Sequence, residues 1–167
     1  QVASVKDDLG NVTTFTYDAN GNRASVQDAE LHTTASEYDE RNLLWKVTDA
    51  AIPAGVTENT YDANGNLTSL KDASNNTTTS TYDDFDRLTR TTYADGTFEQ
   101  YGYDAASNLT SRITPANQTI THVYDALNRL TTKTTPQETT AYTYDRGSRL
   151  TAVADADAAI SYAYDAL

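Results

Sequence analysis

The stretch Tyr61-Asp62-Ala63-Asn64-Gly65-Asn66-Leu67-Thr68 decides the fold, because variants of it recur along the whole chain. Successive repeats begin 21, 23, 21, 21, 21, 20 and 20 positions apart. A fixed period of this length indicates a repeat architecture, in which each unit buries surface mainly against its neighbours. The first two residues of the stretch return as the pairs Tyr17 and Asp18, Tyr38 and Asp39, Tyr61 and Asp62, Tyr82 and Asp83, Tyr103 and Asp104, Tyr124 and Asp125, Tyr144 and Asp145, and Tyr164 and Asp165.

The turn that follows each Tyr-Asp pair can be predicted from two positions, counted from the Tyr as position zero. Position plus three includes Phe85 and Leu127, which disfavours a two-residue type I′ turn, since that turn needs positive φ at both central residues. Position plus four holds residues that mostly tolerate positive φ. We therefore expect a three-residue hairpin loop, a type I turn closed by one left-handed residue. The residues at plus four are Gly21, Asn42, Gly65, Asp86, Ser107, Asn128 and Ser148.

This turn fixes the pairing of the two strands that it joins. Position plus one should face plus five, and position zero should face plus six. An Asp then faces Arg or Asn, as Asp125 faces Arg129, with Asp39 opposite Leu43 as the exception, and each Tyr faces Leu except where Arg23 takes that place. Such cross-strand pairs are worth roughly 0.2–1 kcal/mol each. We interpret Tyr and Leu as packing residues, and Asp as a turn residue that accepts a backbone N–H two residues on.

The composition favours strands throughout. Thr, Tyr and Val suit a pleated surface, and long stretches of helical periodicity are absent. Pro53, Pro115 and Pro136 fall between the expected strands, in connections that we expect to be looser than the Tyr-Asp turns, and the longest spacing places its extra residues around Pro53.

We expect an all-β fold of tandem antiparallel β-hairpins of about 21 residues each, a single array over residues 1–167. About sixteen strands would form a coiled or spiral sheet, part of a β-shell or solenoid, because open twisted sheets rarely exceed about ten strands without curling. A parallel β-helix of the same period is the competing architecture, but it leaves the residues of the turn column unexplained.

The charge and residue counts exclude several classes of protein. The formal net charge is −12 with scattered basic residues, which argues against a nucleic-acid or anionic-membrane surface. The chain has no Cys, and hence no disulfides, thiol chemistry or Cys-based zinc site. Only 38% of the residues are hydrophobic, so we expect no thick core, and no apolar run approaches the roughly 18 residues of a membrane helix.

Both ends of the chain match the interior of a repeat. Ala3-Ser4-Val5 corresponds to Ala24-Ser25-Val26, and Tyr164-Asp165-Ala166-Leu167 stops just before its turn would close. The first residues also lack the charged and apolar regions of a signal peptide. We therefore expect this chain to be a segment of a longer one.

The motifs that could carry chemistry are weak. The segment from Asp18 to Asn22 resembles the first half of a calcium loop, but Arg23 takes the position where an EF-hand has Gly, so a structural turn is the better interpretation. His32 and His122 are not spaced as metal ligands. There is no nucleophile elbow and no phosphate-binding Gly-rich loop. We expect no catalytic residue, no metal and no cofactor, and hence no enzyme.

A stripe of partly aromatic residues lies two positions before each Tyr, on the same face of the strand. We consider Tyr101, Tyr142 and Tyr162 as a possible sugar- or partner-binding surface. The stripe consists of Phe15, Ser36, Asn59, Ser80, Tyr101, His122, Tyr142 and Tyr162.

The repeated unit Tyr-Asp-x-x-Gly/Asn-Asn/Arg-Leu-Thr, in seven full copies and a truncated eighth, resembles that of RHS/YD-repeat proteins. These include RHS polymorphic toxins, bacterial toxin-complex shells and the teneurin adhesion proteins. The resemblance implies a β-strand spiral that, in long members, closes into a hollow cocoon around a toxin or effector segment. Two departures matter. The paired Asp-Pro-x-Gly elements of the family's self-cleaving core are absent here, so no catalytic residue is carried over, and eight units are too few to close a cocoon.

The leading functional hypothesis is a structural shell or scaffold segment of a secreted or cell-surface bacterial protein of the RHS type, which helps to encapsulate or present a toxin or effector. Its partners would be neighbouring repeats of the parent chain and the enclosed toxin domain, with no nucleic acid and no membrane insertion. A second hypothesis is an extracellular adhesive or carbohydrate-binding module that contacts cell-surface glycans. A third is a filament of copies of this chain that pair through exposed strand edges.

Overall fold

A computed structural model of the protein describes residues 1–165 and consists of strands joined by short turns. In this part of the chain no helix is present that could span a membrane. The strands are β1 (Ser4–Lys6), β2 (Val12–Tyr17), β3 (Arg23–Gln27), β4 (Thr33–Tyr38), β5 (Leu44–Thr48), β6 (Val56–Tyr61), β7 (Leu67–Lys71), β8 (Thr77–Tyr82), β9 (Leu88–Thr92), β10 (Phe98–Tyr103), β11 (Leu109–Ile113), β12 (Thr119–Tyr124), β13 (Leu130–Thr134), β14 (Thr139–Tyr144), β15 (Leu150–Ala154) and β16 (Ala159–Ser161).

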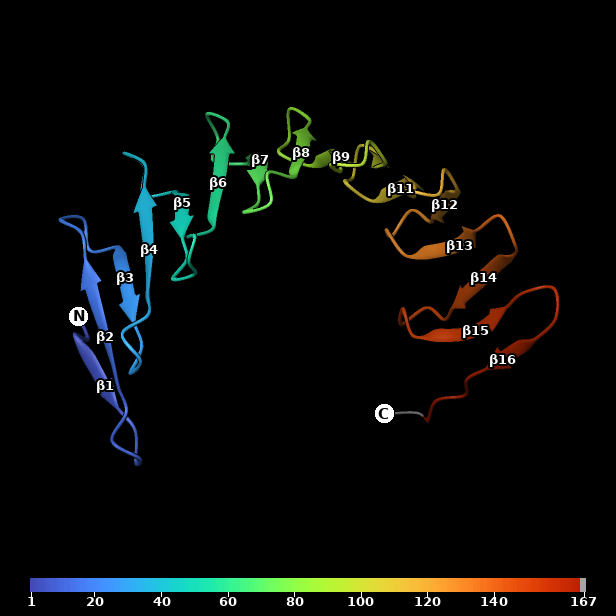
Figure 1. The fold of residues 1–167 in the computed structure, drawn as a ribbon. Helices are drawn as coiled ribbons and strands as arrows, with labels where there is room; N and C mark the ends of the chain where they lie inside the picture. The colour runs from blue at the N-terminus through green and yellow to red at the C-terminus, as the bar shows by residue number, and fades with distance from the viewer. Residues whose placement is uncertain (166–167) are drawn as a thin grey trace. The chain divides into compact units, whose positions relative to one another are not determined.

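The sheet is antiparallel and its strand order is the chain order, from β1 to β16 (Figure 1). The predicted all-β fold of tandem hairpins is confirmed, and the parallel β-helix is wrong. The chain divides into two compact units, Gln1–Asp86 with β1 to β8 and Arg87–Leu167 with β9 to β16. The coiling of the sheet and the single array over 1–167 stay predictions, and the last two residues of the truncated eighth repeat lie outside the described residues.

The Tyr-Asp turns have the predicted geometry. Every residue of the plus-four column has positive φ, from 59° at Asp86 and Asn128 to 91° at Gly21 and Gly65. In the first turn the N–H of Gly21 donates to the carbonyl of Asp18 at 3.1 Å, and the N–H of Asp18 donates to the carbonyl of Asn22 at 2.9 Å. These two bonds define a type I turn closed by one left-handed residue, as the sequence predicts.

The connections at the other ends of the strands are tighter than expected. Most of them repeat the same three-residue turn, so the prediction of looser connections is wrong there. In the turn 7–11, for example, Gly10 has a φ of 90°, and its N–H donates to the carbonyl of Asp7 at 3.0 Å. The physical reason is that Asp, Thr or Tyr opens these turns and one residue takes the left-handed region. That residue is Gly10, Leu31, Asn75, Gly96 or Asn117.

The remaining connections account for the uneven period. The loop 49–55 is two residues longer than the standard turn and lies in the repeat with the 23-residue spacing, so the prediction of extra residues around Pro53 is confirmed. The loops 135–138 and 155–158 are one residue shorter, and each is closed by an N–H to carbonyl bond of 2.8 or 3.0 Å. They lie in the two repeats with the 20-residue spacing.

Each Tyr pairs with position plus six, as predicted, but the next pair along the hairpin reveals a β-bulge. Tyr61 pairs with Leu67, whereas Thr60 pairs with Ser69, so Thr68 is the extra residue. The same shift occurs in the other hairpins for which pairing is described. A bulge of this kind moves every later residue of the strand to the opposite face. Leu67 and Leu70, three positions apart, therefore lie on one face, and this explains the absence of clean alternation after each turn.

The bulge divides the sheet into two faces of different character. We call the face with Tyr61, Leu67, Leu70 and their equivalents the Tyr face, and the face with Thr60, Ser69 and their equivalents the Thr face. In β12 and β14 the residues of the Tyr face are half-buried, and those of the Thr face are exposed. Among the described residues no side chain is fully buried. The predicted absence of a thick core is thus confirmed, because the sheet is a single layer.

Candidate functional site

The repeated Tyr joins each hairpin to the one before it. Between β3 and β4 the backbone pairing runs only from Ser25 opposite Ala35 to Gln27 opposite Thr33, so the strands are not paired near the Tyr-Asp turn. The Tyr hydroxyl bridges this gap by donating to the backbone carbonyl at position plus six of the preceding repeat. The pairs are Tyr38 with Arg23 at 3.3 Å, Tyr61 with Leu44 at 2.7 Å, Tyr82 with Leu67 at 2.9 Å, Tyr103 with Leu88 at 3.0 Å, Tyr124 with Leu109 at 3.1 Å, Tyr144 with Leu130 at 2.9 Å and Tyr164 with Leu150 at 2.7 Å.

These hydroxyl bonds were not foreseen from the sequence, which indicates only a packing role for Tyr. The first Tyr shows the same behaviour, because Tyr17 donates to the carbonyl of Val2 at 2.8 Å. In the sequence, these bonds are indicated by the fact that position zero of every repeat is Tyr and never Phe. A half-buried phenol normally finds a hydrogen-bond partner, which explains that choice.

The repeated Asp organises its own turn. In the first repeat Oδ1 of Asp18 accepts the N–H of Asn20 at 2.9 Å and that of Asn22 at 2.8 Å, and Oδ2 accepts the Asn22 side-chain amide at 2.9 Å. The bond to the N–H two residues on is the one predicted. Position plus five of the second repeat is Leu43, where the other repeats have Asn or Arg. In this turn the side chain of Arg41 donates to Asp39 Oδ2 in place of the missing polar side chain, at 3.1 Å.

These bonds favour the charged form of the carboxylates. The hydrogen bond from the Asn22 side chain is the largest cause of the lowered pKa of Asp18, and the Arg129 side chain plays the same part for the lowered pKa of Asp125. A carboxylate that accepts several N–H bonds is stabilised as the anion. Asp18 and Asp125 are therefore turn-forming anions at neutral pH.

Arg at position plus five connects consecutive turns. Arg129 bonds to Asp125 through Nε at 2.7 Å and donates to the carbonyl of Asp145 at 3.1 Å in the next turn. Its guanidinium also lies over the ring of Tyr144, 4.8 Å from the centroid. Arg87 and Arg149 stack in the same way on the next Tyr, each at 4.7 Å. Partly desolvated stacks of this kind contribute about 0.5–2 kcal/mol.

Asn at position plus five uses a shorter bridge to the next turn. The side-chain amide of Asn22 donates to Oδ1 of Asn42 at 2.8 Å, and that of Asn108 donates to Oδ1 of Asn128 at 2.8 Å. Arg and Asn at this position therefore both connect their turn to the following one.

The three Tyr residues of the possible sugar-binding surface lie on the Tyr face of the second unit. The Tyr101 hydroxyl donates to Glu99, and burial followed by this bond raises the pKa of Tyr101 to about 12. Tyr142 lies opposite Val153, and Tyr162 is 44% exposed. The structure thus places Tyr101 and Tyr142 on one row with His122 between them, and a sugar-binding role for them stays a prediction.

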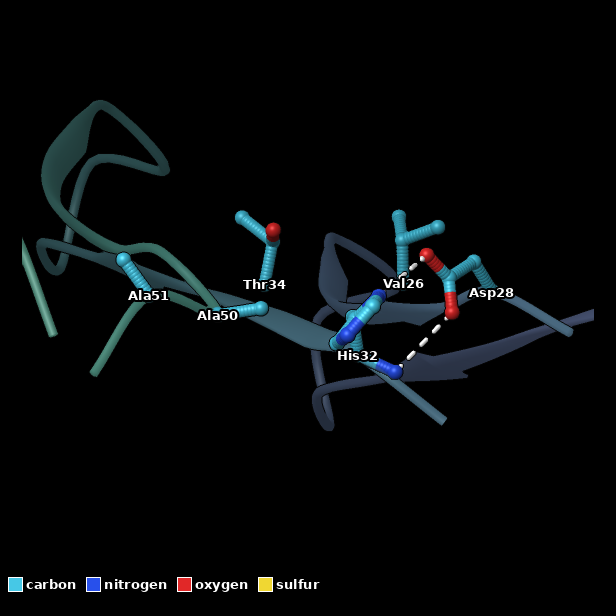
Figure 2. Close-up of a pocket in the computed structure, with 6 residues that line it drawn as sticks. All are labelled: Val26, Asp28, His32, Thr34, Ala50 and Ala51. Atoms are coloured by element: carbon cyan, nitrogen blue, oxygen red, sulfur yellow. Dashed lines mark hydrogen bonds and ion pairs between the residues drawn. The ribbon is translucent and has the colours of Figure 1, made fainter. Parts of the chain in front are cut away.

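His32 belongs to a connecting turn and lines a shallow pocket. Figure 2 shows His32 and Asp28 pointing toward one another at this pocket, which has a volume of about 410 Å³. The N–H of His32 donates to Asp28 Oδ1 at 2.9 Å, and Nδ1 lies 3.1 Å from Oδ2. His32 therefore takes the place that Asn22 has in its own turn. The other lining residues are Val26, Thr34, Ala50 and Ala51.

Groups of three or more His, Asp or Glu side chains that could hold a metal ion are absent from residues 1–165. The turns that resemble half a calcium loop use their carboxylates on backbone and side-chain N–H groups, as Asp18 does. The geometry of the repeats thus supports a structural role for these residues.

Comparison with known proteins supports the same conclusion. The sequence profile described as RHS Repeat matches residues 1–31, 61–97, 103–140 and 124–160. No curated protein sequence matches the chain.

Solved structures with a similar fold include the complex TcdB2-TccC3-Cdc42 (TM-score 0.75, 21% identity), TcdB2-TccC3 (0.74, 21%) and the Photorhabdus luminescens Tc holotoxin pore (0.73, 20%). Each match covers 89–90% of this chain but only 9–10% of the other, so the chain spans about a tenth of those proteins. The antiparallel sheet thus has the fold of a small part of these structures. On the evidence of its repeats, the chain belongs to the RHS repeat family and is a structural scaffold.

Proposed function

We propose that this chain forms part of the wall of a β-shell that encloses a toxin or effector domain in a secreted or cell-surface bacterial protein. The observation that carries the proposal is a single-layer sheet in which residues 1–165 include no fully buried side chain, held together from repeat to repeat by the Tyr, Arg and Asn contacts. A sheet of this kind has two faces and no core of its own, which suits the wall of a shell. Membership of the RHS repeat family and the similarity to Tc toxin structures support it.

The proposal is tested with the full-length parent protein and its variable downstream domain. Proteinase K is added to the parent, and the survival of the downstream domain is compared with that of the same domain expressed alone. Enclosure predicts strong protection in the parent and rapid digestion of the isolated domain. Equal digestion rates, or a parent with only a few repeats and no downstream domain, would refute the shell.

A further inference from the structure

Two of the Tyr-Asp turns contain the dipeptide Asn-Gly, the sequence in which the thermolabile Asn side chain is most exposed to attack by the backbone. They are Asn20-Gly21 between β2 and β3, and Asn64-Gly65 between β6 and β7 (Figure 1). The other ten of the twelve Asn residues precede a residue that has a side chain. Because Gly lacks a Cβ, its backbone nitrogen reaches the side-chain carbonyl carbon of the preceding Asn with the least steric hindrance.

The turn around Asn64 leaves the reacting groups accessible. Asn64 is exposed and lies outside the backbone pairing of β6 and β7, which ends at Tyr61 opposite Leu67. The N–H of Gly65 donates to the carbonyl of Asp62 at 3.2 Å, a long distance for a bond of this kind. The backbone nitrogen is therefore held weakly, and the turn can open locally without disturbing the strands.

The side chain of Asn64 connects its turn to the next one. Its amide nitrogen donates to Oδ1 of Asp86 at 2.7 Å, and the side-chain amide of Asn66 donates to the same oxygen at 2.6 Å. Asn66 also donates to Oδ2 of Asp62 at 3.0 Å, so two carboxylates already share this amide. Arg41 reaches the same turn through the backbone carbonyl of Asp62, at 2.6 Å.

We propose that Asn64 undergoes spontaneous deamidation, which disconnects the third Tyr-Asp turn from the fourth. The nitrogen of Gly65 loses its proton and attacks Cγ of Asn64, and the new C–N bond closes a five-membered succinimide. The side-chain nitrogen takes up a proton and leaves as ammonia. A water molecule then opens the ring at either carbonyl and leaves aspartate or isoaspartate at position 64. No electrons are transferred, and water is the only co-reactant.

The product reverses the contact with the next turn. A carboxylate at position 64 has no N–H to donate, so it faces the Asp86 carboxylate as a second acceptor of like charge. Asn20 also precedes a Gly, but its amide donates to Oδ1 of Asn42 at 3.0 Å. Deamidation of Asn20 thus places the new charge against a neutral amide. The same reaction therefore weakens the contact between turns more at Asn64 than at Asn20.

The test is peptide mass mapping of the intact chain during incubation at mildly alkaline pH. The proposal predicts a gain of about one dalton at Asn64, at least about tenfold faster than at any Asn that precedes a larger residue. Gly65→Asn is the matched control, because Asn42 and Asn128 occupy the same position with positive φ. A Cβ at Gly65 would lie 3.7 Å from the side chain of Leu43, an ordinary contact. This variant should keep its fold, verified by circular dichroism, and lose the fast gain at Asn64.

Urea unfolding of two further variants tests the consequence of the reaction. Asn64→Asp should lower the midpoint more than Asn20→Asp does. Both variants add one negative charge to the same unit, so their comparison removes the effect of net charge. Three results would overturn the proposal: no mass gain at Asn64, an equally fast gain there in Gly65→Asn, or equal midpoints for the two Asp variants.

Discussion

At the scale of the residue, the repeated Tyr combines one contact within its own hairpin with two contacts to the preceding hairpin. Tyr144 at the end of β14 shows all three. It pairs with Leu150 on β15, its hydroxyl donates to the carbonyl of Leu130, and the guanidinium of Arg129 stacks on its ring. Only the first of these contacts is possible within one hairpin. The Tyr is thus the residue through which a repeat depends on the preceding one.

Removal of the hydroxyl isolates one of these contacts. We expect Tyr144→Phe to lower the free energy of unfolding by about 0.5–1.5 kcal/mol, because the carbonyl of Leu130 loses its donor while the ring stays. Urea unfolding followed by circular dichroism measures the change.

Tyr142→Phe on the same strand is the matched control, since the Tyr142 hydroxyl has no hydrogen-bond partner among the described side chains and backbone groups. It should change the stability by less than about 0.5 kcal/mol. Equal losses in the two variants would show that the bond to Leu130 is not the source of the effect.

Leu31 is the least suitable residue in any of the left-handed positions. It has a φ of 68°, whereas the other positions hold Gly, Asn, Asp or Ser. We expect Leu31→Asn to raise the free energy of unfolding by about 1 kcal/mol, since the left-handed conformation costs a residue with a large side chain about 1–2 kcal/mol. Leu9→Asn is the control at the tip of the preceding connecting turn, where φ is not positive, and thermal melting should show almost no change.

The carboxylates of the turns make the free energy of unfolding depend on pH. Side-chain bonds from Asn108 and Arg129 lower the pKa of Asp104 and Asp125 in the folded chain. A lowered folded pKa contributes stability that is fully present above the unfolded value near 3.8 and is lost as the pH falls through the folded value. We expect the urea midpoint to fall between pH 5 and about pH 3.

Asp125→Asn tests the source of this loss. The variant should be less stable than the parent at pH 6, and the difference should shrink at pH 3, because the parent then loses the same charge. Both chains carry the same background of other acids, so their comparison removes the general effect of net charge. A difference that stays constant over this range would contradict the role of the Asp125 carboxylate.

At the scale of the element, turns of the same kind join the strands at both of their ends. Asp49 closes the long loop by accepting the N–H of Ala51 at 2.9 Å and of Gly55 at 2.8 Å. Asp72 closes the standard turn in the same way, with Ser74 and Asn76 both at 2.8 Å. The two loops therefore differ in length but not in the bonds that close them.

Exchange of one loop for the other is thus expected to be tolerated. Replacing residues 50–54 by the three residues Ala-Ser-Asn found at 73–75 should change the free energy of unfolding by less than about 1 kcal/mol, because closure entropy varies slowly with loop length. Urea unfolding measures this change, and amide hydrogen exchange at Tyr61 reports whether the hairpin pairing survives. A loss above about 2 kcal/mol, or fast exchange at Tyr61, would mean that loop 49–55 has a specific structural role.

The sequence predicts the turns well and the strands less well. The residues at plus three and plus four determine the turn type, because steric limits on φ act within a single residue, as at Leu127 and Asn128. The bulge at Thr68 has no comparable local signal, since Thr fits any strand position. The sequence alone therefore does not predict that Leu67 and Leu70 share a face. It also does not predict the bond between the Tyr61 hydroxyl and the carbonyl of Leu44.

At the scale of the whole molecule, the chain is a sheet of one layer, without a fully buried side chain in its described part. Within residues 1–165, contacts between strands are made only by strands that follow one another in the sequence. Such a molecule approximates a one-dimensional array, whose stability is a sum of repeat terms and nearest-neighbour terms. The contacts described for Tyr, Arg and Asn between consecutive repeats are the nearest-neighbour terms.

The most direct test of this claim is urea unfolding of chains with four, six and eight repeats that share the same turns. If each repeat is held by its neighbours, the midpoint and the steepness of the transition both rise with repeat number, and Tyr144→Phe lowers the midpoint of every chain that contains it. A midpoint that is independent of repeat number would contradict the account, because each hairpin would then be stable without its neighbours.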